Sequence, residues 1–154
     1  MEFPAISWAA FAAHGLYILT AFALTLPIAW EREAATRLVG LRTLPLVAVA
    51  CCAYILVGTS VTGEDPTVNA RLLSGLLAGI GFIGGGAILK TVDRVKGTAT
   101  AASILSTGIL GAAVGFGRVE IALLISLITL ATLWLLRPIE RRLDRSGDDE
   151  PDPH

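Results

Sequence analysis

The run Gly79-Ile80-Gly81-Phe82-Ile83-Gly84 has the G-x-G-x-x-G form of a dinucleotide-binding loop. In that fold the motif follows a strand and opens a helix, and an acidic residue about 20 positions later binds the ribose. Here the glycines lie inside an apolar stretch, and the next acidic residue, Asp93, is only nine positions beyond Gly84. The motif therefore favours close helix packing over nucleotide binding.

Few other side chains could do chemistry. Cys51 and Cys52 are adjacent, and since neighbouring helical side chains point apart, we expect apolar fillers rather than a disulfide or a metal site. His14 lies in an apolar stretch, where it is either functional or a neutral partner of a neighbouring helix. No nucleophile lies beside a base and no metal-ligand cluster is present, so we expect neither an enzyme nor a bound cofactor or metal.

Three hydroxyl side chains, Thr100, Ser103 and Thr107, follow the i, i+3, i+7 spacing of one helix face. Such a stripe could be functional, or it could serve local and interhelical hydrogen bonds. The second alternative is favoured, because both kinds of bond are common in apolar helices.

Five stretches without charge must position these groups. They are residues 3–30, 43–63, 72–89, 97–117 and 121–136, and all 12 Lys and Arg and all 13 Asp and Glu lie outside them. A helix needs about 20 apolar residues to cross a hydrocarbon core about 30 Å thick, whereas a soluble helix keeps a charged face. The sequence predicts an all-α membrane protein with five transmembrane helices and excludes a soluble globular enzyme.

The same stretches predict the domain organisation. Residues 144–154 are acidic and rich in turn-forming residues, so we expect a disordered cytoplasmic tail after one transmembrane domain of residues 1–143. The spans are expected at about residues 5–30, 44–62, 72–89, 99–116 and 121–136.

Basic residues are unevenly distributed among the loops. The first and third loops and the C-terminal segment carry ten Lys and Arg, whereas the second and fourth loops carry only Arg71 and Arg118. Because basic residues remain preferentially on the cytoplasmic side, the N-terminus is predicted to be outside and the C-terminus cytoplasmic.

Small residues predict how the spans pack. Lipid tails are as apolar as Leu, so helices in a bilayer associate through close contacts that small residues permit. Glycine pairs four residues apart mark the third and fourth spans, which we expect to form the packed centre, with the first and fifth facing lipid; the three glycines from Gly84 could alternatively break the helix. The pairs are Gly75/Gly79, Gly81/Gly85 and Gly111/Gly115, and the candidate helix-packing residues are Gly75, Gly79, Gly81, Gly84, Gly85, Gly86, Thr100 and Ser103.

Three blocks of sequence carry a family resemblance. The first is Trp30-Glu31-Arg32-Glu33 with Gly40-Leu41-Arg42-Thr43, the second runs from Arg71 to Lys90, and the third is Val95-Lys96-Gly97-Thr98-Ala99-Thr100-Ala101-Ala102-Ser103. In this order they resemble the first cytoplasmic loop, the third span and the start of the fourth span of the MgtC/SapB family of bacterial membrane proteins. The resemblance covers about residues 27–115 and is to the short form of the family, which lacks a soluble C-terminal domain.

The resemblance implies a multi-pass protein of the bacterial inner membrane that is linked to growth under magnesium limitation and, in pathogens, to survival inside host cells. It implies a regulator of other membrane machinery; the alternative is a transporter, or a transport component, for magnesium or another ion. Mg²⁺ is held by carboxylates and waters, and the five spans contain no Asp or Glu. The regulator is therefore the favoured hypothesis.

A regulator needs polar groups that another protein can reach, and these lie at the rims of the spans. The expected partners are membrane lipid, a membrane protein and a second copy of the chain; nucleic acid is not expected. The candidate functional residues are Glu31, Arg32, Glu33, Arg42 and Lys90 on the cytoplasmic side, with Asp65 and Arg71 on the outer side.

Overall fold

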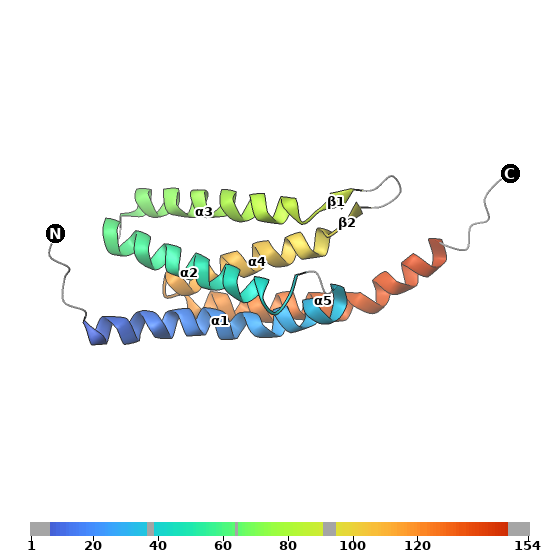
Figure 1. Ribbon diagram of the computed structural model, residues 1–154, viewed down its shortest axis with the longest axis horizontal. Helices are drawn as coiled ribbons and strands as arrows, with labels where there is room; N and C mark the ends of the chain where they lie inside the picture. Colours follow the sequence, from blue (N-terminus) through green and yellow to red (C-terminus); the bar gives the residue numbers. More distant parts are fainter. Residues whose placement is uncertain (1–6, 37–38, 64, 91–94, 148–154) are drawn as a thin grey trace.

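The structure is a computed structural model that describes residues 7–36, 39–63, 65–90 and 95–147, with side chains described to residue 136. Five helices and a short hairpin follow one another along these ranges (Figure 1). They are α1 (Trp8–Thr36), α2 (Thr43–Thr62), α3 (Pro66–Gly86), β1 (Leu89–Lys90), β2 (Val95–Lys96), α4 (Thr98–Gly115) and α5 (Val119–Gly147).

Each helix contains a segment that is long and apolar enough to cross a membrane. The segments are Trp8–Ala35, Thr43–Thr62, Pro66–Gly86, Thr98–Gly115 and Val119–Leu136. The prediction of an all-α, multi-pass membrane protein with five spans is therefore confirmed.

Three helices extend well beyond the predicted spans: α1, which continues to Thr36, α3 and α5. α3 begins at Pro66 because the Asp65 side chain accepts hydrogen bonds from the backbone N–H groups of Thr67 at 2.8 Å and Val68 at 3.4 Å, which caps the helix. α5 continues to Gly147 through Pro138, which removes one backbone donor, because the Arg and Glu residues around it are good helix formers. Residues 144–147 of the predicted tail are thus helical, and residues 148–154 lie outside the described ranges.

The helices form a bundle with two distinct ends (Figure 1). The hairpin end contains the last turns of α1 and α3, the first turns of α2 and α4, and the β1–β2 hairpin. The loop end contains the connections from α2 to α3 and from α4 to α5. In the hairpin Leu89 pairs with Lys96 and Lys90 with Val95.

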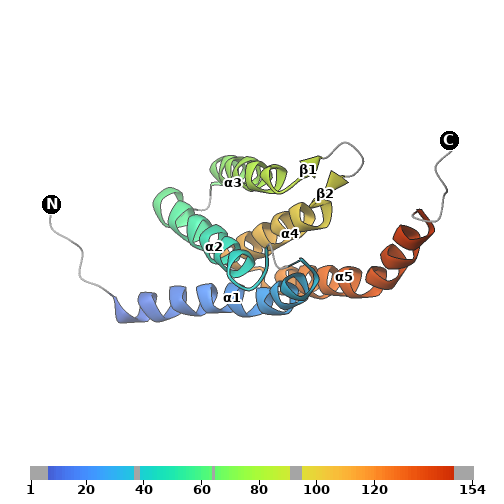
Figure 2. The same cartoon turned by 45° about the vertical axis from the view of Figure 1, so that its right-hand side comes forward.

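The centre of the bundle is α4, which packs against all four other helices. Of its spanning segment 56% is buried, compared with 33% for α2 and 11% each for α1, α3 and α5. Figures 1 and 2 place α3 on one outer side, over α2 and α4. The expectation that the third span shares the packed centre is therefore wrong for a single chain, because α2 occupies that position.

Glycines on α4 allow the close approach of α2. A Cβ on Gly111 would overlap the carbonyl oxygen of Ala48, and one on Gly115 would lie 2.9 Å from the carbonyl oxygen of Cys52. The two glycines, four residues apart, thus bring the two backbones into contact, as small residues do between membrane helices.

The first turn of α4 depends on Gly97. Its φ is +91°, a value that L side chains rarely adopt, and a Cβ there would overlap the Ala87 carbonyl oxygen. Gly97 therefore fixes how the hairpin joins the end of α3 to the start of α4.

Candidate functional site

The hairpin end contains a buried cation. Arg32, in the last turns of α1, is 6% exposed and is the only buried charged side chain among those described. Its Nη2 donates a hydrogen bond of 2.6 Å to Oγ1 of Thr100, which is buried in the first turn of α4. A hydrogen bond to a charged group stabilises a fold by about 1.5–3 kcal/mol, so this contact fixes the end of α1 on the central helix.

Buried hydroxyls continue along α4 from this contact. Ser103 and Thr107 lie on the same helix face as Thr100, and all three are buried. Ser103 donates to the carbonyl oxygen of Ala99 at 2.7 Å, whereas buried Thr107 Oγ1 makes no hydrogen bond within the described ranges. The hydroxyl stripe that the spacing predicts thus faces the interior of the bundle.

Glu33 orders the connection from α1 to α2. Its Oε2 accepts a hydrogen bond of 3.2 Å from the backbone N–H of Leu41. Gly40 is buried, and a Cβ at this position would collide with Glu33, whose Cβ is 2.7 Å away. Together these contacts bring the polypeptide back over α1 before α2 begins.

The other rim residues lie closer to the surface of the bundle. At the hairpin end Glu31 is half-buried, while Arg42 and Lys90 are exposed. Asp65 and Arg71 are exposed at the loop end. The structure therefore brings Arg32 to Thr100 and keeps both far from Asp65 and Arg71, which supports two separate surfaces rather than one site.

The glycines of α3 pack less than their pattern predicts. A Cβ on Gly84 would lie 3.4 Å from the Ala101 carbonyl oxygen, and one on Gly75 would lie 3.5 Å from the Tyr54 hydroxyl. At the other four candidate glycines of α3, an added Cβ would have no atom within 4 Å, so their backbone is open to the surroundings. These glycines are Gly79, Gly81, Gly85 and Gly86. α3 runs unbroken through this region and ends after Gly86, which excludes a break within the G-x-G-x-x-G motif.

The remaining reactive side chains are dispersed. Cys51 and Cys52 are free thiols buried in α2, and His14 is exposed on α1. In the described part of the chain no three His, Cys, Asp or Glu side chains are close enough together to hold a metal ion.

Sequence reasoning missed two features. The contact between Arg32 and Thr100 joins residues 68 positions apart, and neither residue type alone indicates its partner. A groove near Asn69 and Arg118 was also missed, although Asn69 is the only Asn or Gln in the sequence. A lone amide in an apolar helix is a signal that could have pointed to it.

Comparisons with a family model and with individual proteins agree with each other. The family model described as MgtC family matches residues 18–142. "Protein MgtC" of Brucella abortus (strain 2308) is 33% identical over 138 residues, which is 89% of this chain and 57% of the relative. "Protein MgtC" of Salmonella typhimurium (strain LT2) is 32% identical over 130 residues, 84% of this chain and 55% of the relative. The chain thus spans little more than half the length of these relatives, and no solved structure matches it.

Proposed function

The chain belongs to the MgtC family, and on that premise we propose that it is a regulator of other membrane machinery, needed for growth under magnesium limitation. It acts in the inner membrane, with its N-terminus outside and its C-terminus in the cytoplasm, and it is not an enzyme. The distribution of basic residues along the sequence supports this orientation, since the first and third loops and the segment after the fifth span carry ten of the 12 Lys and Arg.

The observation that carries the proposal is that α4 occupies the centre of the bundle and packs against the four other helices. The centre contains apolar side chains, buried hydroxyls and the cation Arg32, and no buried carboxylate is present among the described residues. A Mg²⁺ path needs carboxylates or waters held by them. The described acidic side chains lie instead near the two ends of the bundle, where another protein can reach those that are exposed.

The outer face of α3 supports a membrane-protein partner. Gly81 and Gly85, one turn apart on the same side of α3, have nothing within 4 Å, and such a surface allows the backbone of another membrane helix to approach closely. Lys90, in the strand that follows α3, is exposed at the hairpin end and is available for polar contacts with the same partner.

Crosslinking and co-purification from cells grown in low and high Mg²⁺ test this proposal. Gly81→Leu should remove the partner and abolish growth in low Mg²⁺ while the protein level stays normal, because no atom of the chain fills that space. Gly15→Leu, at a glycine of α1 that also has nothing within 4 Å, is the matched control and should retain both. Normal growth of the Gly81→Leu strain would contradict the role of this face, and recovery of the chain only with itself would identify a homo-oligomer instead.

The alternative, an ion transporter, makes a different prediction. Purified protein in liposomes would then move Mg²⁺ unaided, and Glu31→Gln or Asp65→Asn would reduce the flux. Absence of flux, with growth lost in the same two variants, is the result that we expect of a regulator.

A further inference from the structure

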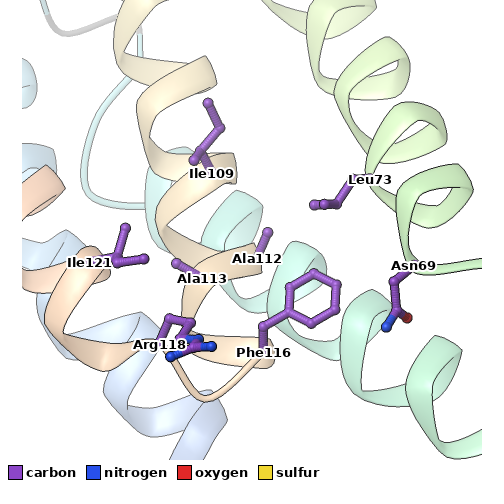
Figure 3. A pocket seen from close by; sticks show the side chains of 8 residues that line it. All are labelled: Asn69, Leu73, Ile109, Ala112, Ala113, Phe116, Arg118 and Ile121. Carbon is purple, nitrogen blue, oxygen red and sulfur yellow. The ribbon is translucent and has the colours of Figure 1, made fainter. Parts of the chain in front are cut away.

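A groove opens between α3, α4 and α5 at the loop end of the bundle (Figure 3). Its volume is about 420 Å³, within the range of about 300–1,000 Å³ for small-molecule sites. Leu73 of α3, Ala112 of α4, Phe116 directly after α4, and Ile121 of α5 supply most of its apolar wall. The groove is therefore built from three helices and has the volume of a small-molecule site.

Polarity changes along the groove. Asn69 in the first turns of α3 and Arg118 in the α4–α5 connection lie on either side of Phe116 (Figure 3). Leu73 lies one turn deeper on α3, and Ile109 lies two turns, about 10 Å, deeper on α4. Polar groups thus lie at the loop end and apolar groups toward the middle of the bundle, which is the polarity of a lipid molecule in a leaflet.

Arg118 is available to an anionic ligand. Its side chain is 69% exposed, and its ion pair with Glu120, itself 65% exposed, is 4.0 Å long. An exposed ion pair of this kind contributes little free energy, so the guanidinium of Arg118 keeps N–H donors for another anion. A guanidinium can bind a phosphate through two parallel hydrogen bonds.

Asn69 provides a second polar group at the same level. Its Oδ1 is buried and accepts no hydrogen bond in the part of the chain that the structure describes. That oxygen needs a donor, which the headgroup hydroxyls of phosphatidylglycerol supply, while the two N–H donors of the amide suit the ester and phosphate oxygens of a lipid.

We propose that this groove binds one anionic phospholipid, with an acyl chain along Leu73 and Ile109 and the phosphate at Arg118. Leu73, Ile109 and Ile121 are between 42% and 46% exposed, and lipid is what surrounds an apolar groove between membrane spans. Since lipid tails are as apolar as Leu, the acyl chain gains little over the bilayer, and the preference comes from the headgroup contact. Charge complementarity with Arg118 favours this occupant over an uncharged apolar helix.

Native mass spectrometry of the purified full chain, titrated with phosphatidylglycerol or with diacylglycerol of the same acyl chains, tests the proposal. The chain should retain one phosphatidylglycerol at concentrations at which diacylglycerol is lost. Arg118→Gln should weaken retention of phosphatidylglycerol by about two- to fivefold, the range for an exposed charge contact. Arg71→Gln, an exposed arginine at the same end outside the groove, is the matched control and should leave retention unchanged.

A second variant tests the apolar part. Ala112→Leu places a side chain in the groove and should lower retention of phosphatidylglycerol further than Arg118→Gln. If Ala112→Leu does not accumulate, Arg118→Gln still tests the proposal, because the Arg118 side chain is exposed and its replacement should not impair folding. Unchanged retention in Arg118→Gln, an equal loss in Arg71→Gln, equal retention of diacylglycerol, or a lipid-free dimer would each overturn the proposal.

Discussion

Changing Thr100 to Val tests whether the buried bond at the hairpin end stabilises the bundle. The substitution keeps the shape of the side chain and removes the hydroxyl that lies 2.6 Å from Arg32 Nη2. Because Arg32 is only 6% exposed, water cannot easily replace the lost acceptor. A bond to a charged group contributes about 1.5–3 kcal/mol, and about 2–4 °C of Tm corresponds to each kcal/mol in a chain of this size. The Tm of Thr100→Val should therefore fall by about 3–12 °C.

A double-mutant cycle separates this bond from the other interactions of Arg32. Arg32→Met removes the charge with all its contacts, so that variant alone does not isolate one of them. Combined with Thr100→Val, it should show a coupling energy of about 1.5–3 kcal/mol. Thermal unfolding of the purified full chain in one detergent at one scan rate gives the Tm values, and reversible unfolding by denaturant in the same detergent gives the coupling energy.

Thr100→Ser is the matched control, since it loses a methyl group and keeps the hydroxyl. It should retain most of the stability that Thr100→Val loses. Equal losses in the two variants would show that packing of the methyl group matters and the bond does not. Additivity of Arg32→Met and Thr100→Val to within about 0.5 kcal/mol would refute the reasoning as well.

Two further predictions concern packing and topology. Gly111→Ala should lower stability by about 1–3 kcal/mol, because its Cβ would overlap the Ala48 carbonyl oxygen. Gly85→Ala, whose Cβ would have no atom within 4 Å, should leave stability unchanged or raise it by up to about 1 kcal/mol. The Tm of each variant measures the effect, and a larger loss in Gly85→Ala than in Gly111→Ala would contradict the packing described. A membrane-impermeant maleimide should label Arg118→Cys in intact cells and Lys90→Cys only after permeabilisation. Labelling of Lys90→Cys from outside would invert the proposed topology.

The five spans could be predicted because hydrocarbon excludes ionised side chains whatever the packing. The helix ends were less predictable, because they depend on local polar groups. The carboxylate of Asp65 starts α3 at Pro66, six residues before the charge-free stretch begins. α5 likewise continues past Leu136, since a helix needs no apolar residues once it has left the membrane.

The packing could be predicted only in part. A glycine indicates that a close approach is possible, but it does not indicate which face has a neighbour. Gly111 meets α2, whereas Gly81 on α3 meets nothing in the chain. A position at the rim of a span predicts an accessible charge, yet Arg32 is buried, because its acceptor on α4 becomes a neighbour only through tertiary structure.

The central position of α4 has a consequence for the synthesis of the protein. Chains are made from the N-terminus at about 5–20 residues per second, so α1, α2 and α3 enter the membrane before the helix that joins them. During that interval the backbone of α2 at Ala48 lacks its neighbour Gly111, and the hydroxyl that accepts from Arg32 is not yet in place. α1 and α2 contact each other directly and can pair before α4 is made, whereas α3 contacts α2 only slightly and packs mainly on α4, so its place in the bundle is completed only after the fourth crossing.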